Sequence, residues 1–279
     1  MTTFTAVGPA LDLDGLLPVA PKHGLLTIPG IIRTEAAERE LNGVNVWGYP
    51  TGCPELWEPC SDGTFRIKSE ESEQPTPRFD SYVVYKPVMC SSIGLSDPEE
   101  LNTRISRVLD ATLSAGIETA LAAGVSGSNN PFIGDSNVDD LTPTPGTAVS
   151  PKVGLSILEN AIGATCRAGI IGATPATVVA LQTDTLEDTD QLVTVNGTPV
   201  YSGDGLIGLT TNDLDAPDVT EDWMVATGPV QVYLGPTVTF DTRSSLDRSD
   251  NTLVFRAERY VLSIWDTALQ AAVLVDWAT

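Results

Sequence analysis

Hydrophobic residues recur at helical spacing over one long stretch of the chain, residues 97–123. Its apolar positions form a broad stripe: Leu101, Ile105, Val108, Leu109, Leu113, Ile117, Ala120 and Leu121. Ser96 and Glu99 fit a capping box before the stripe, and Gly124 is a plausible C-terminal stop. The pattern predicts a single helix, about 40 Å long at roughly 1.5 Å per residue, that acts as a beam.

Strand patterns precede this helix. Residues 64–68 and 79–86 have β character, and a third such stretch begins at Val44. The connection 69–77 is polar, contains two prolines and has no apolar anchor. Two strands joined by such a segment predict a β-hairpin that projects into solvent or reaches toward a neighbouring molecule.

Two longer strands are predicted near the C-terminus, at 228–242 and 251–265. In the second, apolar and polar residues alternate up to Glu258, and Arg259 then falls on the apolar side. Such a change of register predicts a bulge, a strong twist or a strand that is covered on both faces.

The middle of the chain predicts shorter elements. Ser150 and Pro151 are suited to the N-cap and first turn of a second helix, which we expect to end near Gly169. A short helix over 176–181 and two short strands around an Asn196-Gly turn follow. The first 43 residues are punctuated by Gly and Pro, and they predict an extended arm rather than a compact unit.

Composition narrows the possible functions. The 279 residues carry a net charge of −22, which disfavours a surface that grips DNA or RNA, or one that binds anionic membranes. No stretch approaches the roughly 20 apolar residues of a membrane span, and the N-terminus has no basic region typical of a signal peptide. We therefore expect synthesis in the cytoplasm. Of the four cysteines, Cys53, Cys60, Cys90 and Cys166, the first two are close enough in sequence to form a disulfide, and the other interpretation is that all four are reduced thiols.

Each candidate catalytic or ligand-binding motif lacks a residue or an element that its chemistry requires. Residues 203–208 match G-x-G-x-x-G, but the following sequence is a poor helix and no βαβ unit surrounds it. Asp135, Asn137 and Asp139 have the spacing of a calcium loop, yet Asp140 and Gly146 stand where Gly and Glu are needed. His23 is the single histidine, which leaves serine and cysteine nucleophiles without a base. We expect no catalytic residue, no metal and no cofactor.

Basic residues are distributed unevenly. Residues 168–242 contain eleven acidic residues and no Lys or Arg, whereas four of the 15 basic residues lie within 243–259: Arg243, Arg248, Arg256 and Arg259. A solvated strand face is one interpretation of this cluster. The other is an interface, because the guanidinium fork binds carboxylates bidentately.

The order of elements and several local sequences resemble the major capsid proteins of tailed bacteriophages, whose Hong Kong 97-type fold is shared with encapsulins. The stretch from Leu101 to Phe132 looks like the family's spine helix and the loop after it. Val195-Asn-Gly-Thr-Pro-Val and the closing segments Gly228–Tyr233 and Leu246–Arg259 are also similar, most of all to actinobacterial phage capsid proteins.

The resemblance implies an α+β fold with an N-terminal arm, an extended β-hairpin loop, a long spine helix, and peripheral and axial domains. The corresponding ranges are 1–43 for the arm, 44–90 for the extended loop, 91–150 with 228–279 for the peripheral domain (spine helix 97–123), and 151–227 for the axial domain.

The function implied is that of a non-enzymatic major capsid protein. It would self-assemble in the bacterial cytoplasm into hexamers and pentamers of an icosahedral virion shell, and enclose double-stranded DNA without sequence-specific binding. Many members carry a long helical scaffold segment at the N-terminus, whereas the first residues here predict an extended arm. We therefore expect a separate scaffolding protein, with a portal and a decoration protein as further partners. We expect no crosslink at Lys68.

In such a shell, subunits of charge −22 repel one another. We therefore predict that Arg243, Arg248, Arg256 or Arg259 meets a carboxylate of a neighbouring subunit, in the Glu70-Glu71-Glu73 loop or at the acidic end of the long helix. Two alternatives remain open: an encapsulin-like compartment that holds protein, and an acidic, β-rich surface or carbohydrate-binding protein.

Overall fold

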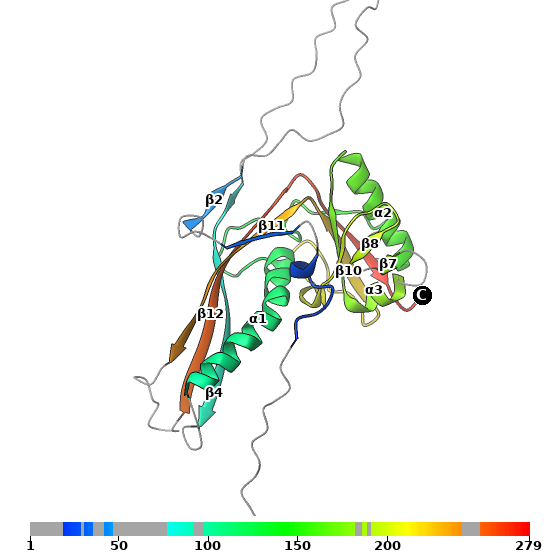
Figure 1. Cartoon of the computed structure of the whole chain (residues 1–279). Helices are drawn as coiled ribbons and strands as arrows, with labels where there is room; N and C mark the ends of the chain where they lie inside the picture. Colours follow the sequence, from blue (N-terminus) through cyan, green and yellow to red (C-terminus); the bar gives the residue numbers. More distant parts are fainter. Residues whose placement is uncertain are drawn as a thin grey trace, which may run out of the picture.

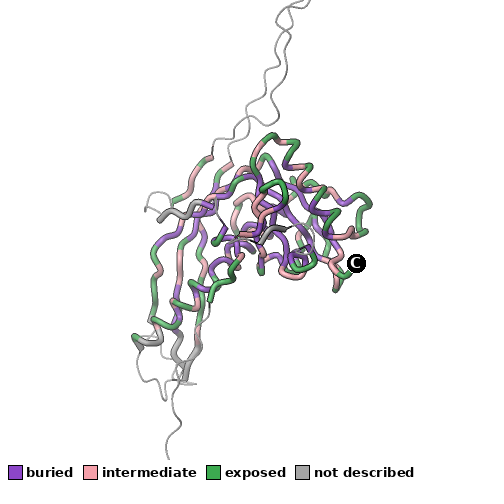
Figure 2. Tube along the Cα trace, turned by 45° about the vertical axis from the view of Figure 1, so that its right-hand side comes forward, coloured by how far each residue is buried: buried purple, intermediate pink, exposed green. Residues whose placement is uncertain are grey.

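The computed structural model describes residues 19–28, 31–35, 42–46, 77–91, 98–181, 186–188, 191–241 and 252–279. These residues form an elongated arm, made of long strands and one long helix, that is joined to a compact end containing α2 and α3 (Figure 1). Buried residues concentrate in the compact end and where it meets the arm (Figure 2). None of the helices in this described part is long and apolar enough to cross a membrane.

The arm is a four-stranded sheet with a helix along one face. The strand order is β1 (Ile32–Glu35), β11 (Val230–Asp241), β12 (Thr252–Trp265) and β4 (Tyr82–Ser91). β11, β12 and β4 pair antiparallel, while β1 runs parallel to β11. The two long C-terminal strands predicted from the sequence are thus confirmed.

Helix α1 (Pro98–Ala123) confirms the predicted long helix. Its 26 residues present the expected apolar stripe to the sheet, where Ile105 and Leu109 pack against Phe255 and Ala257. Gly124 ends the helix with φ +79°, a backbone conformation in which a side chain would be strained, and its N–H donates to the carbonyl of Ala120.

The compact end is built on a five-stranded sheet. The strand order is β5 (Asp139–Asp140), β13 (Gln270–Asp276), β10 (Glu221–Thr227), β6 (Ile170–Ala173) and β9 (Val200–Ser202). Helices α2 (Pro151–Ala164) and α3 (Pro175–Leu181) cover one face of this sheet with Leu155, Leu158, Val178 and Leu181. The other face packs against the end of α1 in a second, larger cluster, so the sheet lies between two apolar layers.

Helix α2 begins where it was predicted, with Ser150 at the N-cap and Pro151 in its first turn, but it ends earlier than expected. Ser150 has extended backbone angles at the N-cap position, but its side chain makes no capping hydrogen bond. The helix ends at Ala164, five residues before Gly169, and Cys166 follows in a left-handed conformation with φ 55°. The short helix predicted at 176–181 is confirmed as α3.

Two chain segments connect the two sheets: β10 of the compact sheet leads into β11 of the arm, and β12 of the arm leads back into β13 of the compact sheet. They lie side by side and come closest at Gly228 and Asp266, where a Cβ on Gly228 would lie 2.6 Å from the Cβ of Asp266. The Asp266 N–H donates to the Pro229 carbonyl at 3.2 Å, and Arg167 forms an ion pair with the Asp266 carboxylate at 2.8 Å. The absence of a side chain at Gly228 therefore lets the two neighbouring segments approach this closely.

Because β12 leads back into the compact end, β13 pairs with β10 in the compact sheet. The sequence-based ranges group 228–279 with the peripheral domain, whereas β13 lies in the five-stranded sheet with β10, β6 and β9. The domain ranges themselves stay a prediction. Further short strands are β2 (Val44–Asn45) with β3 (Arg78–Phe79), and β7 (Leu186–Asp188) with β8 (Leu192–Thr194). The expected hairpin tip, 69–77, lies outside the described residues except for Pro77.

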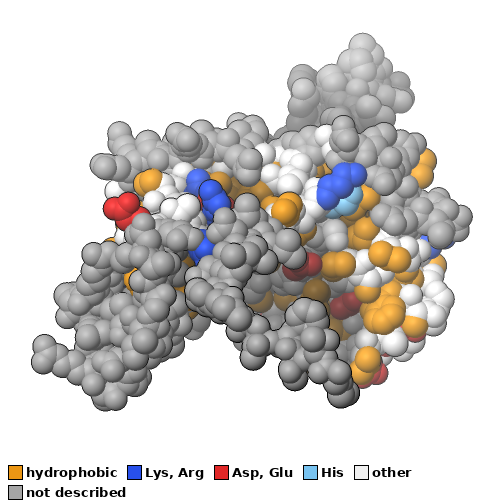
Figure 3. Space-filling model, turned by 60° about the horizontal axis from the view of Figure 1, so that its bottom comes forward, with side chains coloured by type: hydrophobic (Ala, Val, Ile, Leu, Met, Phe, Trp, Pro, Cys, Tyr) orange, Lys and Arg blue, Asp and Glu red, His pale blue; other side chains and the backbone are white. Residues whose placement is uncertain are grey.

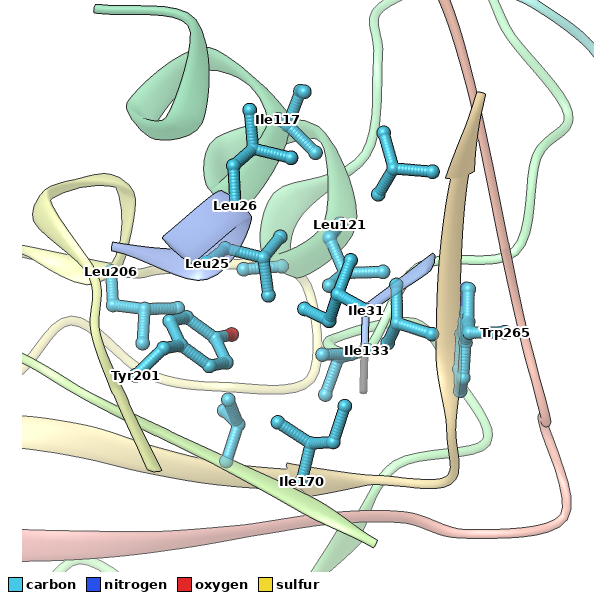
Figure 4. Packing of buried hydrophobic residues seen from close by; sticks show 14 of the residues in the cluster. Leu25, Leu26, Ile31, Ile117, Leu121, Ile133, Ile170, Tyr201, Leu206 and Trp265 are labelled. Atoms are coloured by element: carbon cyan, nitrogen blue, oxygen red, sulfur yellow. The ribbon is translucent and has the colours of Figure 1, made fainter. Parts of the chain in front are cut away.

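The N-terminal segment 19–28 contributes to the core, whereas the sequence predicts that residues 1–43 form an extended N-terminal arm. It contains the short 3-10 helix η1 (Leu25–Thr27), in which Leu25 is 0% exposed. Figure 4 shows Leu25 and Leu26 inserted between Ile117 on α1 and Leu206 in the loop that holds η3 (Asp204–Leu206). Apolar burial, and not local propensity, fixes this segment.

Candidate subunit interface

The two faces of the arm sheet differ in what covers them. One face carries Phe255 and Ala257 beneath α1, and both are 0% exposed. The opposite face exposes large hydrophobic side chains from three adjacent strands: Val83, Tyr85, Val238, Phe240 and Tyr260. Their exposed fractions range from 38% to 59%.

Strand register makes these residues one continuous patch, which we call the arm-sheet face. Tyr260 lies opposite Val83, Glu258 lies between Tyr85 and Val238, and Arg256 lies between Pro87 and Phe240. Residues directly opposite in antiparallel strands share a face. An exposed patch of this kind, with charged groups at its centre, is typical of a protein–protein contact.

Arg256 lies at the centre of the arm-sheet face. Its Nε donates to the Glu258 carboxylate at 2.6 Å, and its guanidinium carbon lies 5.3 Å from the centroid of the Phe240 ring. The Arg256 side chain stays 46% exposed, whereas that of Glu258 is 15% exposed. The contacts with Phe240 and Glu258 hold the guanidinium at the patch, where its terminal N–H groups can reach an incoming carboxylate.

Arg259 points to the other side of the sheet, as the alternation of residues predicts. Its Nε donates to the Gly235 carbonyl at 2.8 Å, and its Nη1 pairs with Asp110 on α1 at 3.2 Å. The Gly235 carbonyl is available because the β11–β12 register shifts between Leu234 and Thr237. The extra residue of this register shift lies on β11 and not in the strand 251–265 for which a bulge, a strong twist or cover on both faces was predicted. Arg259 binds its own chain beside the shift.

The remaining predicted contact residues lie outside the described part of the chain: Arg243, Arg248, Glu70, Glu71 and Glu73. The structure therefore places Arg256 and Arg259 on opposite faces of the sheet. That any of the predicted residues contacts a neighbouring subunit stays a prediction. Sequence reasoning missed the apolar side chains around Arg256. A signal was present in Tyr82-Val-Val-Tyr85, a strand segment that is apolar at successive positions and hence on both faces.

Hydrophobic side chains also reach the surface elsewhere. Figure 3 shows several of them on the compact end, and Val195, Ile207 and Val219 are all more than half exposed. A hollow of about 740 Å³ lies between α2 and the turn after β8, where Glu159 accepts hydrogen bonds from Thr194 and Asn196.

The two candidate ligand-binding motifs, residues 203–208 and 135–139, form a short 3-10 helix and a hydrogen-bonded loop. The glycine-rich stretch 203–208 forms η3, which is only three residues long, and no nucleotide-binding helix starts there. In the loop 135–139, Oδ1 of Asp135 accepts hydrogen bonds from the Asn137 N–H at 2.8 Å and from Gln270 at 2.5 Å. Among the described residues, no group of three or more His, Cys, Asp or Glu could hold a metal ion.

The structure differs from the sequence-based prediction for the cysteines at Cys166. Cys166 is disulfide-bonded, so the prediction that all four thiols are reduced is wrong at this position. Cys166 is exposed in the turn after α2, and its backbone is left-handed with φ 55°. The side chains of Cys53, Cys60 and Cys90 lie outside the described residues.

Comparison with known proteins gives no match by sequence and clear matches by structure. No protein-family model and no curated protein matches the chain. The holo-SrpI encapsulin complex from Synechococcus elongatus PCC 7942 contains a similar chain, with a TM-score of 0.55 and 11% identity over 97% of this chain and 92% of that one.

Two further solved structures are similar over nearly their whole length. The capsid of an empty GTA particle has a TM-score of 0.55 and 13% identity, covering 97% of this chain and 95% of that one. A chain of Mycobacterium phage Ogopogo has a TM-score of 0.54 and 15% identity, covering 96% of each. The predicted α+β fold is confirmed: this chain has the fold that capsid and encapsulin shell subunits share.

Proposed function

We propose that this chain is a major capsid protein, a shell subunit that assembles with copies of itself. The fold supports a shell protein, since the similar structures include a particle capsid and an encapsulin. The observation that carries self-assembly is the arm-sheet face, which leaves Tyr85 59% and Phe240 42% exposed on a strongly acidic chain. A second copy would cover this face and place a carboxylate against Arg256.

In the full proposal the subunits form hexamers and pentamers, which close into an icosahedral virion shell around double-stranded DNA. Assembly takes place in the host bacterial cytoplasm, with a separate scaffolding protein, a portal and a decoration protein as partners. The acidic stretch 168–242 supports enclosure without adhesion, because eleven acids and no base cannot neutralise phosphates. The proposal includes no enzymatic activity.

A matched pair of substitutions tests the interface. Val238 lies on the arm-sheet face and Val219 lies off it, and both are exposed. We expect Val238→Asp to abolish particle formation, because it buries an unpaired carboxylate beside Glu258, while Val219→Asp assembles normally. Sedimentation measures assembly, and a thermal melt of each unassembled subunit checks folding. Equal assembly of the two folded variants would contradict the proposed interface.

An assembled structure tests the arginine prediction separately. We expect at least one of Arg243, Arg248, Arg256 and Arg259 to contact a carboxylate of a neighbouring subunit. If all four bind only water or their own chain, this part of the proposal is wrong, whereas self-assembly itself stands.

An encapsulin-like compartment is the second candidate, since its subunit is matched with the same TM-score, 0.55, as the particle capsid. The two functions differ in cargo. Shells purified from cells that also express the neighbouring genes would contain nuclease-protected DNA in the first case and a specific protein in the second.

A further inference from the structure

A buried carboxylate joins three separate parts of the molecule. Glu118 lies on α1 and is 1% exposed. Its Oε1 accepts hydrogen bonds from the Leu25 N–H and the Ser114 hydroxyl, both at 2.9 Å. Its Oε2 accepts one from the Gly205 N–H at 3.2 Å. The N-terminal segment 19–28 and the loop containing η3 are thus both bound to α1 through one side chain.

The surrounding residues allow this close contact. The Ser114 hydroxyl oxygen also accepts a hydrogen bond from the Leu26 N–H at 3.2 Å, so two successive amides of η1 are bound. A Cβ on Gly205 would lie 2.6 Å from the Ala115 carbonyl oxygen, and one on Gly24 would lie 2.9 Å from the Ser114 hydroxyl. Glycine at both positions lets the backbone approach α1 closely enough to reach the carboxylate.

Glu118 has no cationic partner in the described part of the chain, where no Lys or Arg forms an ion pair with it. The titratable groups on the elements packed around it are Lys22 and His23 before η1, Asp204 in η3 and Tyr201 on β9. Burial raises the pKa of Glu118, the N–H and hydroxyl donors lower it, and the charge of Asp204 raises it further. Burial also raises the pKa of Tyr201, whose hydroxyl has no hydrogen-bond partner.

Because the pKa of Glu118 is raised, the packing of the N-terminal segment 19–28 and the η3 loop against α1, which we call the docked state, depends on pH. When the segment and the loop are docked, Glu118 binds a proton more tightly than it does in water, because burial penalises the charged form. The docked state is therefore favoured below the docked-state pKa and is weakened as the pH rises through it. Each unit of pKa difference between the two states changes the docking equilibrium about tenfold.

We propose that Glu118 is a proton-linked latch, which holds the N-terminal segment 19–28 and the η3 loop against α1 more tightly in acid than at neutral pH. Release of the segment would uncover Leu25 and Leu26 together with the apolar residues of α1 beneath them, Leu113 and Ile117. The latch is a property of the single subunit, so it stands or falls independently of the proposed shell function.

Hydrogen exchange of the full-length, unassembled subunit tests the latch at pH values from about 4 to 8, with rates corrected for intrinsic exchange. We expect protection of residues 19–28 and 203–206 to fall as pH rises, while β13 stays protected. Glu118→Gln, which cannot ionise, should flatten this profile. Asp213→Asn removes an exposed acid elsewhere and should leave the wild-type profile unchanged.

Asp204→Asn provides a second test that does not disturb the core, because Asp204 is exposed. It removes the charge that raises the pKa of Glu118, so the midpoint of the protection profile should move to lower pH. A folded Glu118→Gln variant that keeps the wild-type pH dependence would overturn the proposal. If Glu118→Gln does not fold, an unchanged midpoint in Asp204→Asn would overturn it instead.

Discussion

The N-terminal segment offers the clearest test of how the core is built, through the substitution Leu25→Ala. Leu25 is 0% exposed and packs in the cluster that joins α1 to the compact end. The change removes three carbon atoms, which at about 0.8 kcal/mol each amounts to roughly 2.4 kcal/mol of lost transfer free energy. The cavity left behind adds to this, so we expect a total loss of about 3–5 kcal/mol.

Urea-induced unfolding of the unassembled subunit, followed by circular dichroism, measures this loss in the free energy of unfolding. Val19→Ala is the matched control, since Val19 lies in the same segment but is 86% exposed, and it should change stability by less than about 0.5 kcal/mol. A loss below about 1 kcal/mol for Leu25→Ala would refute the placement of this segment in the core.

Two further predictions concern glycine positions and nucleic acid. Gly205→Ala should cost about 1–3 kcal/mol in unfolding free energy, because its Cβ would lie 2.6 Å from backbone atoms of α1. Gly163→Ala, inside α2 with nothing within 4 Å, should instead stabilise the protein by about 0.5–1 kcal/mol, and a Gly205→Ala variant as stable as wild type would contradict the close contact. The purified subunit should not bind double-stranded DNA near physiological salt in a mobility-shift assay, and binding that strengthens at low salt would contradict the non-adhesive role of the acidic stretch 168–242.

Elements with a clear period could be predicted from the sequence. The apolar stripe of 97–123 required a helix, and α1 spans Pro98–Ala123. Alternation around Arg256 and Glu258 placed Arg256 and Arg259 on opposite faces of β12, as the structure has them. In each case the signal is local, because neighbours three, four or two positions apart decide which side chains share a face.

Elements buried on both faces escaped prediction. In β10 and β13 nearly every position is buried, so Trp223–Ala226 and Ala271–Val275 show neither alternation nor a helical stripe. Leu25 and Leu26 form only a short apolar pair, and their burial depends on α1 and the η3 loop, which lie far away in sequence. Glu118 likewise looks like an ordinary helix surface residue until Leu25 and Gly205 are brought to it.

Electron microscopy of the expressed protein tests the central claim most directly. The full chain would be purified alone and with the products of neighbouring genes, and examined by negative staining for closed particles. The proposed function predicts shells of uniform size, whose loss in Val238→Asp and retention in Val219→Asp would point to the arm-sheet face. Monomers under every condition, from a protein that is folded by circular dichroism, would contradict it.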